Sequence, residues 1–160
     1  MMAGPLSKRV GIAQVDFGAR VTIIEPVNLY GCAIGDDAFI GPFVEIQSGV
    51  SIGSRTRVQS HSFICEGTVI GEDCFIGHGV MFINDSFARG GPARGDRSFW
   101  GQTRIGSNVS IGSNATLLPV DICSGTVVGA GSVVTKSISE PGVYAGNPAR
   151  KLRGLNDQVS

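Results

Sequence analysis

A large apolar residue recurs at every sixth position through most of this chain, and this period limits the folds that the chain can adopt. The members of the first unbroken series are Ile34, Ile40, Ile46, Ile52, Val58, Ile64, Ile70, Ile76 and Phe82. A second series consists of Ile105, Ile111, Leu117, Ile122, Val128 and Val134, and a weaker one of Val15, Val21 and Val27. An α-helix repeats about every 3.6 residues and a long strand every two, so a period of six predicts neither.

Small residues accompany the period and indicate regular corners. Glycine often follows the apolar residue, as at Gly35, Gly53 and Gly71, and tolerates the positive φ that tight corners need. Each repeat therefore predicts a short strand followed by a corner. If three repeats close one triangular coil, equivalent residues stack at the sheet spacing of about 4.8 Å. We predict a single all-β domain over residues 1–160, a parallel β-helix of about six coils spanning residues 15–138.

Composition excludes several classes of function. The chain has 160 residues, 24 of them glycine, and its formal net charge is zero, so it offers no basic field to nucleic acid or to an anionic membrane surface. The opening stretch "MMAGPLSKRVGIAQV" lacks the apolar run of a signal peptide, and no later run reaches the roughly 20 apolar residues that a spanning helix needs. We therefore expect a cytoplasmic protein without nucleic acid or membrane partners.

The period stops at residues 84–99, "NDSFARGGPARGDRSF". Charged residues stand here among Gly and Pro, so the segment cannot continue an apolar column and is predicted to loop out. Loops that interrupt a rigid repeat are frequent binding elements, and arginine side chains match phosphate oxygens in forked geometry.

The repeat also places polar residues relative to one another. Residues about one coil apart occupy corresponding positions, which puts the only two histidines, His61 and His78, at the same corner. By the same arithmetic Ser48, Glu66 and Asn84 form a column at the next corner. Because the interior is filled by apolar residues, these side chains face water or a neighbouring protomer.

The repeat strings "IGDDAFIGPFVEI", "IGEDCFIGHGVMF", "IGSNATLLP" and "VVGAGSVVTK" resemble those of the hexapeptide-repeat acyltransferases. The ending "GVYAGNPARKLRG" resembles the usual close of that family. The resemblance implies a left-handed β-helix that works as a homotrimer, with acetyl-CoA as co-substrate and sites between protomers. The string "HSFICEGTVIGEDCFIGHGVMFIND" resembles the enzymes that acetylate an amino group on a nucleotide-linked sugar for surface-polysaccharide synthesis.

Acetyl transfer to an amine needs a group that orients the nitrogen and one that accepts a proton. Histidine is suited to accepting the proton, and we predict His78 or His61 in this role. The departing thiolate is an alternative acceptor. We predict that the Asn84 side chain positions the amine, and that corner N–H groups stabilise the oxyanion.

The resemblance also implies the binding residues. The loop is expected to reach across the subunit boundary and enclose the nucleotide sugar, and the predicted substrate-binding residues are Glu66, Asp85, Arg89, Arg94 and Arg97. The strings "VGAGSVVTK" and "GNPARK" resemble the acetyl-CoA groove, within a C-terminal tail at 139–160. The predicted cofactor residues are Gly129, Ala130, Gly131, Ser132, Lys136, Asn147, Pro148, Arg150 and Lys151.

Three other interpretations remain at this point. O-acetylation of a sugar or small alcohol needs a stronger base than N-acetylation. A zinc hydratase of the β-helical type needs three histidine ligands, and the chain has two histidines and no Cys-x-x-Cys pair, so we predict no metal. A scaffold without acyl transfer is the non-enzymatic alternative, and the intact cofactor strings argue against it.

Overall fold

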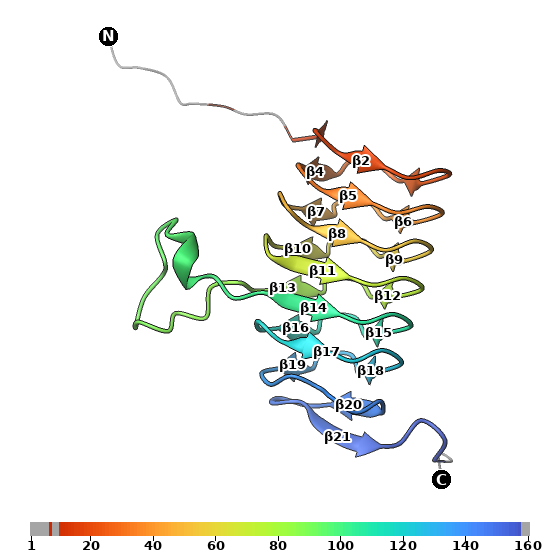
Figure 1. Ribbon diagram of the computed structural model, residues 1–160, viewed down its shortest axis with the longest axis vertical. Helices are drawn as coiled ribbons and strands as arrows, with labels where there is room; N and C mark the ends of the chain where they lie inside the picture. The colour runs from red at the N-terminus through yellow and green to blue at the C-terminus, as the bar shows by residue number, and fades with distance from the viewer. Residues whose placement is uncertain (1–6, 8–9, 158–160) are drawn as a thin grey trace.

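The chain winds into a β-helix of three parallel sheets, from which one loop projects sideways (Figure 1). The computed structural model describes Ser7 and residues 10–157. Most of the opening stretch "MMAGPLSKRVGIAQV", which we predicted to lack a signal peptide, lies outside these described residues. Within them, no helix combines the length and the apolar character that crossing a membrane demands.

Every third strand along the chain belongs to the same sheet, as a triangular coil requires. Sheet A contains β1 (Ile12–Ala13), β4 (Asn28–Tyr30), β7 (Glu45–Ile46), β10 (Phe63–Ile64), β13 (Met81–Phe82), β16 (Thr116–Leu117) and β19 (Val133–Val134). Sheet B contains β2 (Asp16–Phe17), β5 (Ala33–Ile34), β8 (Ser51–Ile52), β11 (Thr68–Ile70), β14 (Thr103–Ile105) and β17 (Asp121–Ile122). Sheet C contains β3 (Thr22–Ile23), β6 (Phe39–Ile40), β9 (Arg57–Val58), β12 (Phe75–Ile76), β15 (Ser110–Ile111), β18 (Val127–Val128), β20 (Val143–Ala145) and β21 (Arg150–Arg153).

The coil is left-handed, which confirms the fold that the family resemblance implied. In Figure 1 the strands of sheet B cross the front from left to right while the chain descends from its N-terminal end. Sheets A, B and C have seven, six and eight strands, so the coil makes about seven turns rather than six. It extends beyond 15–138 because β1 adds a strand before the first apolar repeat, and β20 continues sheet C after the last one.

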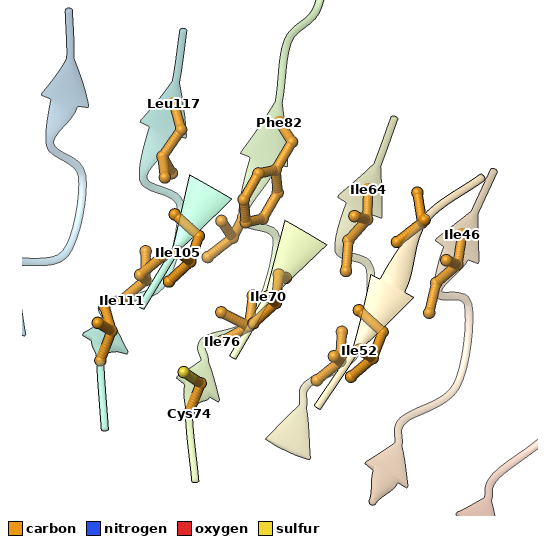
Figure 2. Close-up of a cluster of buried hydrophobic side chains, with 14 of the residues drawn as sticks. Ile46, Ile52, Ile64, Ile70, Cys74, Ile76, Phe82, Ile105, Ile111 and Leu117 are labelled. Atoms are coloured by element: carbon orange, nitrogen blue, oxygen red, sulfur yellow. The ribbon is translucent and has the colours of Figure 1, made fainter. Parts of the chain in front are cut away.

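The inward side chains form continuous apolar columns (Figure 2). On sheet A, Ile46 pairs in register with Ile64, and Phe82 with Leu117, and all four are fully buried. The first pair is 18 positions apart and the second is 35, so the turn between Phe82 and Leu117 carries 35 − 18 = 17 extra residues. These residues form the projecting loop, which includes the 3₁₀ turn η1 (Arg97–Phe99).

The loop leaves and rejoins the coil at one point. The Gly101 N–H donates to the Asn84 carbonyl at 2.8 Å, which closes the base of the loop. The columns on either side therefore remain in register, because the extra residues never enter the ladder. The predicted protruding loop is thus confirmed.

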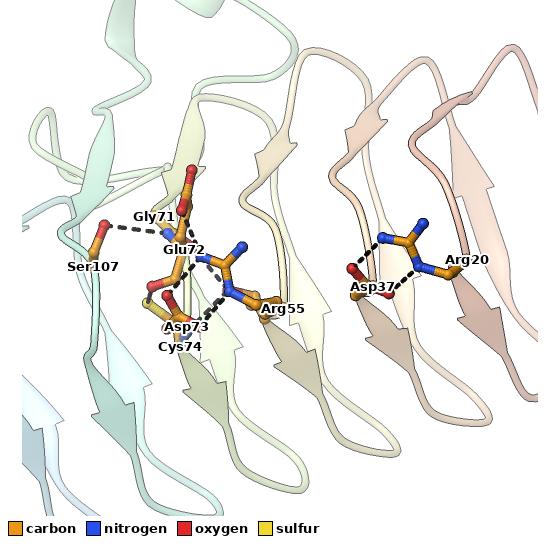
Figure 3. A network of polar contacts seen from close by, with 9 residues as sticks. Arg20, Asp37, Arg55, Gly71, Glu72, Asp73, Cys74 and Ser107 are labelled. Carbon is orange, nitrogen blue, oxygen red and sulfur yellow. Dashed lines mark hydrogen bonds and ion pairs between the residues drawn. The ribbon is translucent and has the colours of Figure 1, made fainter.

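The corner between sheets B and C carries ion pairs between successive turns (Figure 3). Arg20 binds Asp37, and the Arg55 guanidinium donates to both Asp73 carboxylate oxygens, at 2.7 and 2.8 Å, and to Glu72 at 2.7 Å. The hydrogen bonds from Arg55 lower the pKa of Asp73. Exposed ion pairs of this kind add little to stability, so we interpret this corner as structural surface.

Buried hydroxyl groups join turns inside the coil. The Thr56 hydroxyl donates to the Gly71 carbonyl at 2.8 Å and accepts the Cys74 N–H at 3.0 Å. Ser62 makes the matching pair of bonds one repeat later, and both side chains are fully buried. The backbone groups at these corners thereby receive partners that the short strands do not supply.

We expect Thr56→Val to lower the free energy of unfolding by about 1–3 kcal/mol, because it leaves the Gly71 carbonyl and the Cys74 N–H buried without this partner. Denaturant unfolding monitored by circular dichroism would measure the change. Thr22→Val is the matched control, since Thr22 is exposed and should tolerate the same change. Equal stability of the two variants would contradict the structural role of the Thr56 hydroxyl.

Candidate functional site

The outer face of sheet A is bounded by two corners that carry the predicted site residues. The corner between sheets C and A, here called the histidine edge, contains Phe43, His61, His78, Asn114 and Gly131. The corner between sheets A and B, here called the asparagine edge, contains Ser48, Glu66 and Asn84. The projecting loop leaves from the asparagine edge.

The two histidines have different partners on their shared edge. The His78 Nδ1 atom lies 2.8 Å from the Ser60 hydroxyl, and the His78 side chain is exposed. The His61 ring stacks on Phe43, with ring centroids 4.8 Å apart and an interplanar angle of 30°. The Ser60 hydroxyl engages the Nδ1 atom and leaves Nε2 as the ring nitrogen for proton transfer, which suits His78 better than His61 to this role.

The Asn84 amide is held in one orientation. Its Nδ2 group donates to the Glu66 carbonyl at 3.1 Å. Because a backbone carbonyl can only accept, this contact fixes which end of the amide is NH₂. The Asn84 Oδ1 atom is left as the acceptor that the side chain offers to a ligand.

Asn84 lines a pocket with a volume of about 590 Å³. The lining residues are Phe63, Met81, Phe82, Ile83, Asn84, Asp85, Ser86, Phe87 and Leu118. Sheet A supplies the floor and the start of the loop supplies one wall. The site is therefore an apolar hollow with a single amide at its edge.

The structure does not bring the histidines next to Asn84 within one chain. Strand β13 crosses sheet A between His78 and Asn84. His78 precedes this strand and Asn84 follows it, so the two residues lie on opposite edges of sheet A.

Two of the predicted phosphate-binding arginines make contacts within the loop. Arg97 forms an ion pair with Glu66 at 3.2 Å, and its guanidinium lies 5.8 Å from the Trp100 ring centroid. The Arg89 guanidinium lies 3.8 Å from the Phe99 ring centroid. These contacts tie the loop to the asparagine edge and hold its own turns together.

Asp85 organises the start of the loop. Its two carboxylate oxygens accept the backbone N–H groups of Phe87 at 3.0 Å and Ala93 at 2.7 Å. Both oxygens of Asp85 are therefore used to hold the loop, so a contact with the substrate, as predicted, would share oxygens that already accept these hydrogen bonds. Arg94 is exposed further along the loop, with a positive φ of 51°.

The predicted cofactor residues fall into two groups. Residues 129–132 lie on the histidine edge, two turns after His78 and three after His61, and backbone hydrogen bonds join the successive turns of this edge. Ala130 and Gly131 are exposed. Ser132 is buried, and its hydroxyl accepts the Gly146 N–H at 3.2 Å, so Ser132 supports the corner rather than facing outward.

The second group lies at the C-terminal end of the coil. Lys136, Arg150 and Lys151 line a pocket of about 320 Å³, so the fold brings Lys136 beside the consecutive cations Arg150 and Lys151. A hydrogen bond from Lys151 to the Glu140 carboxylate, 2.9 Å long, raises the pKa of Lys151. Residues 147–148 lie in the exposed turn between β20 and β21. The described residues contain no group of three His, Cys, Asp or Glu side chains placed to hold a metal ion.

Sequence reasoning missed the apolar wall of the pocket beside Asn84. Phe63 and Met81 directly precede inward residues, so they point to the outer face, where polar residues are common. Large apolar residues immediately before the inward residue of a repeat are the sequence signal that identifies an apolar patch on the outer face of sheet A. The contribution of Phe87 follows from the conformation of the loop, which the repeat does not determine.

Two family models match the repeats on both sides of the loop. The bacterial transferase hexapeptide (six repeats) matches residues 31–66, and the hexapeptide repeat of succinyl-transferase matches residues 67–82 and 102–136. The gap in the second match falls on the projecting loop. The repeat pattern and the three-sided coil therefore agree.

Curated proteins and solved structures show similar relationships. The chain is 34% identical to serine acetyltransferase 2 of Arabidopsis thaliana over 114 residues, which cover 69% of this chain and 34% of that protein. It thus spans about a third of the length of this relative. A hexapeptide-repeat containing acetyltransferase of Vibrio cholerae O1 biovar eltor, solved with acetyl coenzyme A, is 26% identical with a TM-score of 0.67 over 79% of this chain and 72% of that one. A galactoside acetyltransferase solved with coenzyme A is 30% identical with a TM-score of 0.67, over 78% and 65% of the two chains.

Proposed function

Because this chain belongs to the hexapeptide-repeat transferase family, we propose that it moves an acetyl group from acetyl-CoA to the amino group of a nucleotide-linked amino sugar. The donor is supported by two similar structures, one solved with acetyl coenzyme A and one with coenzyme A. The gathered cations Lys136, Arg150 and Lys151 suit its phosphates. The exposed small residues Ala130 and Gly131 let a ligand approach the backbone closely.

The orientation of Asn84 is the observation that carries the choice of an amine as acceptor. Its Nδ2 group is bound to the Glu66 carbonyl, so its Oδ1 atom accepts a hydrogen bond from the ligand. An amine has an N–H to donate and keeps its lone pair for attack. Asn84 therefore orients the nitrogen without competing for its lone pair.

The reaction that these residues support is a direct transfer. The amine nitrogen forms a bond to the thioester carbonyl carbon, the carbon–sulfur bond breaks, and coenzyme A departs as the thiolate. The nitrogen loses one proton, which the His78 Nε2 atom accepts if Nδ1–H donates to the Ser60 hydroxyl, and the imidazolium then passes this proton to the thiolate to give the thiol. Because His78 and Asn84 lie on opposite edges in one chain, the proton acceptor would be His78 of the partner subunit.

Because a site that combines His78 and Asn84 needs edges from two copies, we propose a homotrimer with three sites between protomers. We also propose that the acetylated product is used in surface-polysaccharide biosynthesis. Exposed apolar side chains support association, among them Phe75 and Val69 on the outer faces of sheets C and B. Burial of such side chains between copies would stabilise the assembly.

O-acetylation of a sugar is the second candidate. It is favoured by the 30% identity to a galactoside acetyltransferase. A hydroxyl needs a stronger base than an amine does, because it must lose its proton as it attacks. The His78 imidazole could also serve as the base for O-acetylation. The two candidate functions are therefore distinguished by which acceptor, an amine or a hydroxyl compound, is acetylated.

The proposed function predicts selective thiol release with amines. Incubation with acetyl-CoA and a panel of nucleotide-linked 3-amino and 4-amino sugars should release coenzyme A thiol, measured by a thiol reagent. Matched nucleotide sugars that carry hydroxyl groups in place of the amine are the controls. Release with the hydroxyl compounds alone would establish O-acetylation, and no release with either set, while acetyl-CoA still binds, would remove the sugar assignment.

We expect Asn84→Ala to lower kcat by about 100-fold with the amino sugar, because the nitrogen is no longer held in line with the thioester. Steady-state kinetics would measure kcat and KM, and thermal unfolding would check the fold. Asn156→Ala changes an exposed asparagine near the C-terminus and should leave kcat unchanged. A kcat for Asn84→Ala within twofold of the parent would contradict the positioning role.

We expect His78→Gln to lower kcat by about 100-fold, because the proton acceptor is lost. His61→Gln should keep a kcat near that of the parent, since the His61 ring stacks on Phe43 instead of binding Ser60. Steady-state kinetics would measure both values, and an unchanged kcat for His78→Gln would instead indicate that the departing thiolate takes the proton.

A further inference from the structure

Two bulky side chains on the histidine edge occupy an unfavourable backbone conformation. Phe43 has φ 62° and His61 has φ 64°, in the left-handed region that large residues rarely adopt. At the corresponding position of later turns the chain has Gly79, Asn114 and Gly131, which adopt this region at lower cost. Arg20 and Arg55 adopt the same region on the corner between sheets B and C, so the conformation alone assigns no function, but it raises the question of what the aromatic rings of Phe43 and His61 contact.

The Phe43 ring lies on the surface of the coil. It is 58% exposed, and its aromatic contact is with the exposed His61 ring. A glycine or asparagine would close the same corner with less strain. The stacked pair therefore presents an exposed aromatic surface at this edge.

A pocket lies against Phe43 on the outer face of sheet A. It has a volume of about 220 Å³ and is lined by Val10, Pro26, Val27, Asn28, Phe43, Val44 and Glu45. The Asn28 Nδ2 group donates to the Glu45 carboxylate at 3.1 Å, which leaves the Asn28 Oδ1 atom as an acceptor. An aromatic wall with an acceptor at its edge suits a flat ring that carries an N–H group.

This aromatic pocket and the pocket beside Asn84 are neighbours on one face. Glu45 pairs in register with Phe63, and Phe63 pairs with Met81. Glu45 lines the first pocket, whereas Phe63 and Met81 line the second. Adjacent strands are about 4.8 Å apart, so the linings of the two pockets border one another on this face.

We propose that Phe43, supported by His61, stacks on the nucleobase of the acceptor, with the Asn28 Oδ1 atom facing an N–H group on the base edge. This subsite rests on the proposed function, since it places the base at one end of the face and the amino sugar beside Asn84 at the other. The adenine of coenzyme A is the other possible source of a nucleobase. It is the less suitable one, because the gathered cations lie at the opposite end of the coil.

Calorimetric titration of the full chain with UDP and TDP tests the proposal. We expect Phe43→Gly to weaken binding about 10-fold or more, because base–aromatic stacking is lost. The same variant should keep or raise the thermal unfolding midpoint, because glycine relieves the positive φ. Phe43→Tyr should retain binding, and Phe17→Ala, which removes an exposed ring on sheet B, should change nothing.

The other outcomes overturn the proposal in distinguishable ways. Equal affinity of Phe43→Gly and the parent chain for both nucleotides, or no binding by the parent chain, would remove the subsite. Weakened binding of coenzyme A instead of UDP or TDP would assign the stack to adenine, and loss of the oligomer with unchanged nucleotide affinity would assign it to a contact between copies. If Phe43-dependent binding is found but no amino sugar is acetylated, the subsite stands and the proposed function fails.

Discussion

In-register stacking of one inward side chain per strand is the constraint on which this molecule depends. Each strand is too short to bury a face alone, so stability comes from columns such as Ile46, Ile64, Phe82 and Leu117. A turn that lost register would place its apolar residue outside the column and an outward residue within it. The corners must therefore close at fixed positions, which explains the left-handed residues and the buried hydroxyls found there.

The same constraint determines where an insertion can occur. Seventeen additional residues are accommodated because they leave and rejoin at one corner, where Gly101 binds the Asn84 carbonyl. Asn84 thus belongs both to the rigid coil and to the rim of the loop. The position of its backbone is fixed by the register of the coil, while its side chain lines the pocket that the loop helps to form.

The period in the sequence was sufficient to predict the strands, the triangular coil, the shared corner of His61 and His78, and the projecting loop. The spacing of the repeats predicts these features because only one register of successive turns buries the apolar residues. The roles of Asp85 and Ser132 could not be predicted, since the first depends on the loop conformation and the second on the position of the Gly146 N–H in the following turn. The apolar pocket was missed because outward positions are unconstrained by the columns. The handedness came from family resemblance rather than from the period.

The antiparallel strand β21 has a consequence for how the molecule behaves at high concentration. A stack of parallel turns ends in unpaired strand edges, onto which another molecule could add as a further turn. Here β21 covers the last strand of sheet C, Ala149 bonds to Val133 of sheet A, and Ile138 bridges Ile122 of sheet B. These contacts use part of the edge that the last turn would otherwise leave unpaired, and β21 runs against the direction of a further parallel turn, so both disfavour end-to-end growth into filaments.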